Sequence, residues 1–332
     1  MYIRKQDLQH LAGESTFLWG ARQTGKSTLL KSLYPDSLYF DLLLTDVFER
    51  LRRNPGLLRE TLLANTRPDG SPATGPVIID EIQRIPELLN EIHWLIANKG
   101  IQFILCGSSP RKILRSGANL LGGRALRNDL YPLIYKEITG FDLLKALNSG
   151  LLPRHYKSSR YEQLIAAYLG SYLQDEILAE AKIRNIQSFT RFLEIAALSN
   201  GEIVNYTSTA AESGVSAPTI KEYFQILEDT MVGRFLPSFR KKPKRRVIHA
   251  PKFYFFDNSI PNHLLKRGRM EWGSESIGNA FENYMYHEIF AHSHYTGLQY
   301  PIYYWRTASN LEVDFILGNH ELAIEVKASQ QV

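Results

Sequence analysis

The run TFLWGARQTGKSTLL, close to the N-terminus, restricts the fold of this chain more than any other stretch. An apolar segment typical of a buried strand leads into the spacing G-x-x-x-x-G-K-S, and an apolar-periodic segment typical of a helix follows. In this context the glycines let the backbone wrap a phosphate, and the helix N-terminus supplies free N–H groups and partial positive charge. The sequence therefore predicts a phosphate-binding loop, or P-loop, between a strand and a helix.

The residues of this loop are expected to hold ATP. Lys26 would reach the outer phosphates, and Ser27 would bind the Mg²⁺ ion that accompanies the nucleotide. So short a pattern also arises by chance, and its interpretation therefore depends on the strands that follow. The expected nucleotide-binding residues are Gly20, Ala21, Arg22, Gln23, Thr24, Gly25, Lys26, Ser27 and Thr28.

Two further apolar segments support the interpretation. The first, GPVIIDEIQ, ends in Asp80, expected to hold Mg²⁺ through water, and Glu81, expected to polarise the attacking water. The second, IQFILCGSS, would bring Ser108 beside these acids, although an ordinary strand-ending turn explains it equally well. Alternating strands and helices up to about Tyr131 predict an α/β fold with a doubly wound, mostly parallel sheet. Cys106 is expected to be a small buried hydrophobe.

The middle of the chain is predicted to be helical. After helical periodicity from about Phe141 to Arg184, three helices are expected, with a turn at Gly214 and an N-cap at Ser216 before the third. This order predicts a helix-turn-helix with a wing. The third helix is poor in cations, so a packing module of the same shape is an equal alternative. The loop RKKPKRR (residues 240–246) is the better candidate for DNA contact, or else a solvated wing.

The C-terminal stretch EVDFILGNHELAIEVKAS crowds acids into a predicted hairpin. A two-residue turn at Gly318-Asn319 would pair Leu317 with His320 and set Glu312 opposite Glu325. Carboxylates this close repel unless a cation lies among them, so the hairpin is either a metal site or a solvated face. The candidate metal ligands are Glu282, on a preceding helix, Asp314 and Glu325, and Lys327 would position or activate water.

At the level of these segments the chain resembles a known family. GARQTGKSTLL, VIIDEIQRIPELL, FILCGSS and LLGGRALRNDLYPLIYKEI are similar to the AAA-type (AAA+) P-loop ATPases near the archaeal-ATPase clade, which carry a C-terminal domain of unknown function (DUF4143) related to restriction endonucleases. The resemblance implies that Ser108 is a sensor and Arg124 an arginine finger or sensor, acting in its own chain or a neighbouring one. It also implies that Glu282, Asp314, Glu325 and Lys327 are the two acids and the E-x-K pair of a nuclease-like core, in that order along the chain.

Three domains are expected: residues 1–140, an AAA-type ATPase domain; residues 141–247, a helical linker and winged-helix-like module; and residues 248–332, a restriction-endonuclease-like domain. Such a core normally continues beyond its E-x-K strand, so this one is expected to be shortened, with an exposed edge at residues 321–327. No run approaches the roughly 20 apolar residues of a membrane span, and no signal peptide is evident, so a soluble, cytoplasmic protein is expected.

The expected function is Mg²⁺-dependent ATP binding and hydrolysis coupled to DNA binding or processing. One alternative is a nucleotide-regulated binding protein with a catalytically silent nuclease-like domain, and another is an ATP-controlled endonuclease. The net charge of +5 is too small to identify a polyanionic partner by itself. A protein partner and a homo-oligomer are further expected partners, and no membrane association is expected.

Overall fold

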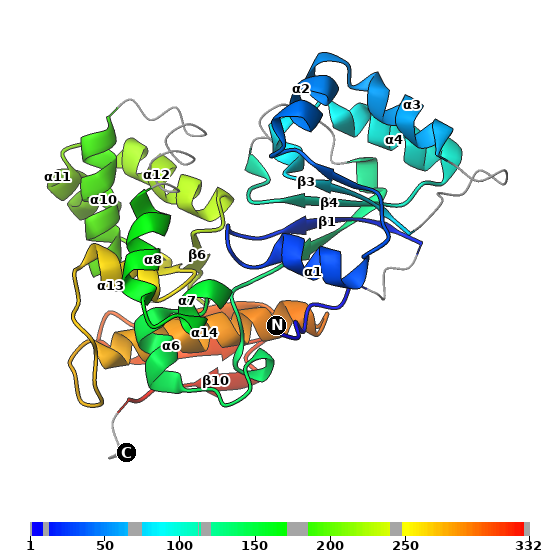
Figure 1. The fold of residues 1–332 in the computed structure, drawn as a ribbon. Coiled ribbons are helices and arrows are strands. Elements are labelled where there is room, and N and C mark those ends of the chain that lie inside the picture. The colour runs from blue at the N-terminus through cyan, green and yellow to red at the C-terminus, as the bar shows by residue number, and fades with distance from the viewer. Residues whose placement is uncertain are drawn as a thin grey trace. The chain divides into compact units, whose positions relative to one another are not determined.

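The computed structural model describes residues 2–8, 13–65, 75–111, 113, 121–170, 185–239 and 248–328. The chain divides into two compact units. The first unit is Gln6–Tyr131, and the second unit joins Met1–Lys5 to Pro132–Val332. Figure 1 shows the elements of each unit along the chain. None of the helices in these described ranges is long and apolar enough to cross a membrane.

The first unit is built on one sheet whose neighbouring strands are all parallel. Its order is β2-β3-β4-β1-β5, so the chain crosses over between strands in the manner of a doubly wound fold. The prediction of an α/β fold with a parallel sheet is confirmed. The strands are β1 Ser15–Trp19, β2 Tyr39–Asp41, β3 Val77–Asp80, β4 Phe103–Gly107 and β5 Ala125–Asp129.

Helices cover both faces of this sheet (Figure 1). On one face Leu29 and Leu30 of α1 pack with Leu18, Ile104 and Cys106 of the strands, and the buried cysteine is a small hydrophobe as predicted. The three central strands β3, β4 and β1 are fully buried because both faces are covered, which explains their continuous apolar sequence, whereas the edge strands β2 and β5 are partly exposed. The helical segments are α1 Lys26–Leu33, α2 Thr45–Arg53, α3 Gly56–Ala64, η2 Ile82–Arg84, α4 Leu88–Lys99 and η3 Leu121–Gly123.

The second unit begins with short helices and continues with a three-helix group. Asn205 caps α11, and Ser216 caps α12 by accepting a hydrogen bond from the Thr219 N–H group, as predicted. Gly214 ends α11 in the left-handed conformation, with φ of 70°. The helical segments are η4 Tyr135–Glu137, α6 Leu143–Ser149, α7 Pro153–Lys157, α8 Tyr161–Tyr168, α10 Ile186–Leu198, α11 Tyr206–Ser213 and α12 Ala217–Asp229.

Two antiparallel strands, β6 (Gly233–Leu236) and β7 (Lys252–Phe255), follow α12. Their aromatic residues pack against α12, since the ring of Phe224 meets the rings of Phe235 and Phe253. Three helices are followed by a strand pair, and the winged-helix assignment of this part stays a prediction. The basic loop at 240–246, predicted to contact DNA, lies outside the described residues.

The chain ends with α13 (Ser259–Leu264), α14 (Ile277–Tyr295) and a small antiparallel sheet in the order β10-β9-β8. Its strands are β8 Ile302–Arg306, β9 Glu312–Leu317 and β10 Leu322–Ile324. Tyr286 and Ile289 of α14 pack against Tyr304 and Phe315 of the sheet. β10 is an edge strand with Leu322 exposed, and it is shorter than the predicted segment 321–327.

The predicted hairpin register is wrong by two residues. Leu317 pairs with Leu322, and not with His320, so the connection is four residues long. A two-residue type I′ turn at Gly318-Asn319 needs positive φ at both of these residues, whereas here positive φ occurs at Gly318 (64°) and His320 (66°). Side chains alternate with a period of two, so the shift leaves every residue on its predicted face.

Candidate functional site

The P-loop directs its lysine inward. Lys26, at the start of α1, is buried, and its Nζ atom donates to the carbonyl oxygens of Gly20, at 2.6 Å, and Ala21, at 3.1 Å. A Cβ atom at position 20 would lie 2.4 Å from the Leu130 carbonyl oxygen, so only glycine fits there. Gly25 takes φ of 95°, which an L side chain rarely adopts. The loop therefore has the backbone shape and buried cation that phosphate binding needs.

Ser27 and Asp80 meet across 53 residues of sequence. The Ser27 hydroxyl donates to Asp80 Oδ2 at 2.6 Å, and the Tyr39 hydroxyl donates to the same oxygen at 2.5 Å. Burial and the neighbouring Asp80 raise the pKa of Tyr39, so the phenol stays protonated as a donor. A hydroxyl and a carboxylate side by side are the hard oxygen ligands that suit Mg²⁺.

A chain of hydrogen bonds links Glu81 to the next strand. The Gln83 amide Nε2 atom donates to Glu81 Oε2 at 2.5 Å and to Ser108 Oγ at 3.0 Å. A Cβ atom at Gly107 would lie 2.4 Å from Gln83 Oε1, so glycine there is what lets the amide approach β4. Glu81 itself has φ of 61°, an uncommon conformation for a residue other than glycine and one that recurs at functional sites.

Within one chain, Arg124 lies far from the P-loop and from the acids Asp80 and Glu81. It is exposed and directly precedes β5, whose first residue, Ala125, pairs with Ser15 at the start of β1. The P-loop follows Trp19 at the other end of β1, and five residues of strand span about 16 Å. That distance exceeds the reach of an arginine side chain, so an arginine-finger role is compatible only with the nucleotide of another chain.

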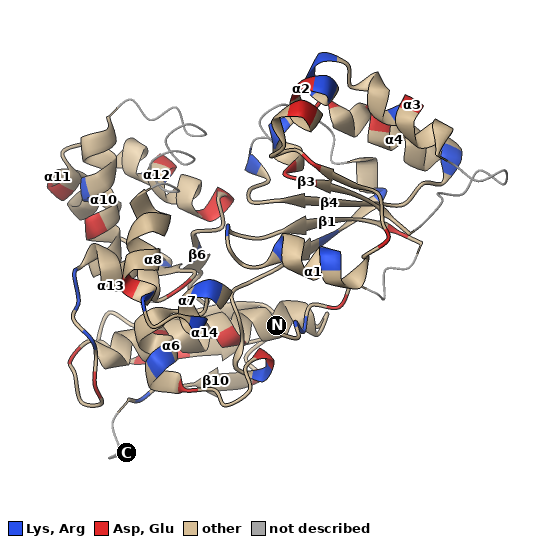
Figure 2. Ribbon diagram, in the orientation of Figure 1, with Lys and Arg blue, Asp and Glu red and all other residues tan. Residues whose placement is uncertain are grey.

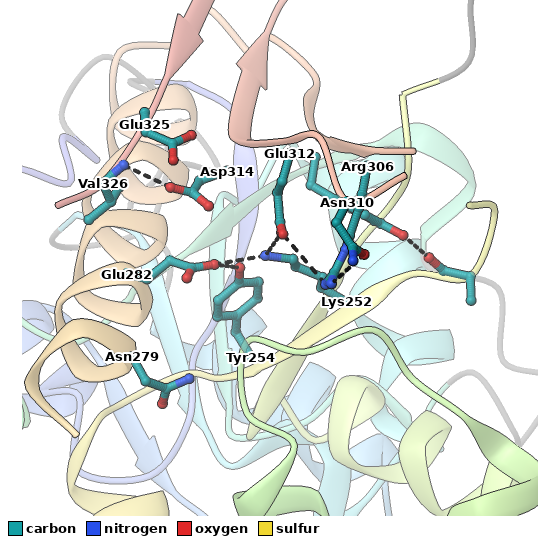
Figure 3. Close-up of polar contacts among 12 residues, drawn as sticks. Lys252, Tyr254, Asn279, Glu282, Arg306, Asn310, Glu312, Asp314, Glu325 and Val326 are labelled. Atoms are coloured by element: carbon teal, nitrogen blue, oxygen red, sulfur yellow. Dashed lines mark hydrogen bonds and ion pairs between the residues drawn. The ribbon is translucent and has the colours of Figure 1, made fainter. Parts of the chain in front are cut away.

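The C-terminal acids surround a lysine that sequence reasoning missed. Lys252 on β7 is buried, and its Nζ atom lies 3.0 Å from Glu282 Oε1 and 2.8 Å from Glu312 Oε1 (Figure 3). The Tyr254 hydroxyl also donates to Glu282 Oε1, at 2.5 Å. Burial by itself would lower the pKa of Lys252, but Glu282 and Glu312 raise it overall, so the ammonium stays charged.

The remaining acids have other partners. Asp314 is buried and accepts the Val326 N–H group at 2.7 Å; burial raises its pKa, an effect that this hydrogen bond reduces. Lys327 pairs with Glu325 at 2.5 Å on the exposed edge. Among the described residues, no group of three or more His, Cys, Asp and Glu side chains is arranged to hold a metal ion. The metal-ligand role of Glu282, Asp314 and Glu325 stays a prediction.

Family models match three consecutive parts of the chain. Residues 13–139 match an AAA domain, residues 141–271 a domain of unknown function (DUF8612), and residues 277–332 a domain of unknown function (DUF4143). The chain is an AAA-type P-loop ATPase with a C-terminal DUF4143 domain. The resemblance stated from the sequence is thereby confirmed, and ATP binding follows from the AAA domain.

Relatives of this ATPase include uncharacterized proteins of Mycobacterium bovis and Mycobacterium tuberculosis, each 24% identical over 323 residues, or 93% of this chain and 69% of the relative. Among solved structures, the ORC1 protein of Aeropyrum pernix in complex with DNA has a TM-score of 0.33 at 11% identity, with 76% of this chain and 87% of that one covered. A STAND protein of Pyrococcus horikoshii has a TM-score of 0.27 at 14% identity, covering 86% and 45%. These structural likenesses are too weak to bear on function.

Sequence reasoning missed three residues around the two sites of the ATPase. Tyr39 and Gln83 contact predicted site residues in the P-loop region, and Lys252 joins the C-terminal acids. Gln83 stands two positions after Glu81, so the run DEIQ held the one local clue. Tyr39 and Lys252 reach their partners only through sheet pairing and helix packing.

Proposed function

We propose that this ATPase hydrolyses ATP with Mg²⁺ at the P-loop and couples turnover to DNA binding by its second unit. The observation that carries the proposal is the 2.6 Å hydrogen bond between Ser27 Oγ and Asp80 Oδ2, beside the buried ammonium of Lys26. Residues 20–28 would hold the nucleotide. Mg²⁺ bound near Ser27 and Asp80 would neutralise phosphate charge.

The roles of the chain's own residues follow from their positions. Lys26 binds the outer phosphates, and Asp80 holds the ion through water while Tyr39 fixes the orientation of the carboxylate. Glu81 accepts a proton from the attacking water, since it follows Asp80 at the end of β3 and Gln83 orients its carboxylate. Ser108 contacts the same amide and serves as the sensor at the end of β4. Arg124 acts between chains, which requires at least a dimer.

The decisive experiment measures ATP hydrolysis with and without single-stranded, duplex and branched DNA. Lys26→Ala is expected to abolish turnover, because the phosphates lose their cation. The matched control is Lys99→Ala, which removes an exposed lysine at the end of α4 and is expected to have wild-type activity. Turnover that survives Lys26→Ala would sink the P-loop assignment, and no stimulation by any DNA form would favour a protein partner instead.

A second candidate is a nucleotide-regulated binding protein whose nuclease-like domain is silent. The position of Lys252 favours it, because an ammonium already bridges Glu282 and Glu312, two acids close to the predicted metal ligand Asp314. An ATP-controlled endonuclease needs Glu282, Asp314 and Glu325 to converge on a metal ion, with Lys327 positioned to activate the attacking water. If the protein cleaves DNA with Mg²⁺ or Mn²⁺ and Asp314→Ala abolishes this cleavage, the protein is an endonuclease. If neither ion supports cleavage, the nuclease-like domain is catalytically silent.

A further inference from the structure

Two neighbouring pockets in the second unit are lined by cations. A pocket of about 470 Å³ is lined by residues of α7 and α8, among them Arg154, Lys157 and Arg160. A pocket of about 390 Å³ is lined by α8, α13 and the segment after α13, among them Lys266, Arg267 and Arg269. Figure 2 shows the blue colour of Lys and Arg on α7 and on the chain that follows α13. These six side chains are called the α8 basic surface.

The excess of positive charge at this surface is local. The two pocket linings hold three Lys or Arg side chains each, six in all, and a single acid, Glu162. The whole chain has 39 Lys and Arg residues against 34 Asp and Glu residues, close to parity. A ratio this far from the average concentrates positive potential on both sides of one short helix, where it attracts anions.

The cations of the α8 basic surface have no neutralising partner among the residues that the structure describes. None of the six forms an ion pair or a side-chain hydrogen bond with a residue that the structure describes, whereas buried Lys252 and Arg4 each contact glutamates. Arg267 is half-buried, and burial lowers its pKa without an offsetting carboxylate. A desolvated guanidinium in this state gains most from an external anion.

The chemistry of the side chains indicates the kind of anion. Four of the six are arginines, whose planar guanidinium matches the oxygens of a phosphate group in a bidentate manner. Tyr161 and His263 are the only ring side chains in the two linings, and both belong to the same pocket, so the surface offers no row of platforms for stacking unpaired bases. Cations on both sides of α8 suit a polymer of repeated phosphates, whereas a single phosphate would occupy one pocket.

We propose that the α8 basic surface binds the phosphate backbone of duplex DNA. This inference rests on the proposed coupling of the ATPase to DNA and names the surface that makes the contact. None of its residues belongs to the third helix of the helix-turn-helix, α12, or to the sequence 240–246, where DNA contact was expected. The contact is independent of base sequence, because it involves phosphates alone, and it weakens as salt rises because bound cations release counterions from the DNA.

The experiment measures duplex DNA affinity of the full chain over a series of salt concentrations. One double variant is Arg154→Gln with Lys157→Gln, and the other is Lys266→Gln with Arg269→Gln, all four exposed. Each double variant is expected to make the slope of log affinity against log salt concentration less negative by about 2. Each lost phosphate contact changes this slope by about 0.9. The control, Arg52→Gln with Arg53→Gln, removes two exposed cations of α2 and is expected to keep the slope.

The folding check combines ATP hydrolysis without DNA, for the first unit, with the thermal unfolding transition of the second unit, and all three variants are expected to retain both. If the unaltered chain binds duplex DNA and neither variant of the α8 basic surface changes the slope, the surface assignment is overturned and the coupling to DNA stands. If the unaltered chain binds no DNA, the surface assignment and the proposed coupling to DNA are both overturned, while ATP turnover still identifies an active enzyme. Tighter binding of duplex RNA or of single strands through these residues would overturn the assignment to duplex DNA.

Discussion

At the scale of single residues, the amide of Gln83 determines where the Glu81 carboxylate lies. Gln83→Leu removes the hydrogen bonds to Glu81 and Ser108 and keeps a side chain of similar size. A hydrogen bond to a charged group contributes about 1.5–3 kcal/mol, so we expect kcat to fall roughly 10- to 100-fold. KM for ATP should change little, because Gln83 contacts none of the P-loop residues in the hydrogen bonds described. Steady-state kinetics would separate the two constants.

The matched control for Gln83 is Gln225→Leu, on the exposed face of α12. Gln225 also donates to carboxylates, those of Glu228 and Asp229, but it belongs to the second unit. We expect its kcat to equal that of the unaltered protein. A rise in kcat after Gln83→Leu would contradict the positioning role, because it would mean that the amide holds Glu81 away from the attacking water.

Lys252 supplies the positive charge between two of the C-terminal acids, Glu282 and Glu312. Lys252→Met leaves Glu282 and Glu312 close together without the ammonium between them. Because both carboxylates are partly exposed, we expect the free energy of unfolding to fall by about 2–4 kcal/mol, somewhat less than for a fully buried pair. Denaturant unfolding at pH 7 measures this, with exposed Lys99→Met as the control. A change equal to that of the control would show that the bridge contributes nothing.

At the scale of elements, α14 carries a carboxylate whose ionisation opposes folding. Burial raises the pKa of Glu288 to about 7, although the Tyr135 N–H group and the Tyr284 hydroxyl both donate to it. The folded state therefore holds this proton more tightly than the unfolded state, whose pKa is near 4.5. Below about pH 4.5 the Glu288 carboxyl is protonated in both states and does not affect stability. As pH rises from 4.5 toward 7, the carboxyl ionises in the unfolded state but not in the folded state, so the free energy of unfolding decreases.

Glu288→Gln tests the ionisation of this carboxylate. The glutamine keeps an acceptor for the Tyr135 N–H group but has no charge, so the variant should be more stable than the unaltered protein by about 1–3 kcal/mol at pH 8. At pH 4.5 the two proteins should be equally stable. Thermal unfolding across this range measures the difference, and a gap that is constant with pH would mean that the carboxyl group of Glu288 titrates normally.

The sequence predicted the elements better than the contacts between them. The P-loop and the acid-ended strand are local patterns, so the parallel α/β sheet and the meeting of Ser27 with Asp80 followed from the fold they define. Lys252 and Glu282 are 30 residues apart, and only the pairing of β6 with β7 and the packing of α14 bring them together. The length of the β9–β10 turn depended on which residue takes positive φ, and His320 carries no sequence signal for that.

At the scale of the whole molecule, the first five residues of the chain belong to the second unit, together with Pro132–Val332. Arg4 pairs with Glu137 at 3.0 Å, with both side chains buried, and the Lys5 N–H group donates to Glu137 at 2.6 Å. The pairing of β6 with β7 likewise crosses the boundary expected at residue 247. Each unit has hydrophobic clusters of its own, such as Leu18 with Leu30 in the first and Tyr286 with Phe315 in the second.

Separate cores predict separate unfolding transitions, of which one responds to nucleotide. ADP with Mg²⁺ at one hundred times its Kd should stabilise the unit Gln6–Tyr131 by about 2.7 kcal/mol, because the ligand binds only the folded P-loop. The transition of the second unit should keep its Tm. Differential scanning calorimetry of the full chain measures both, and Lys26→Ala should remove the shift. If nucleotide raised both transitions equally, the two units would unfold as one, and the two-core description of the chain's stability would be wrong.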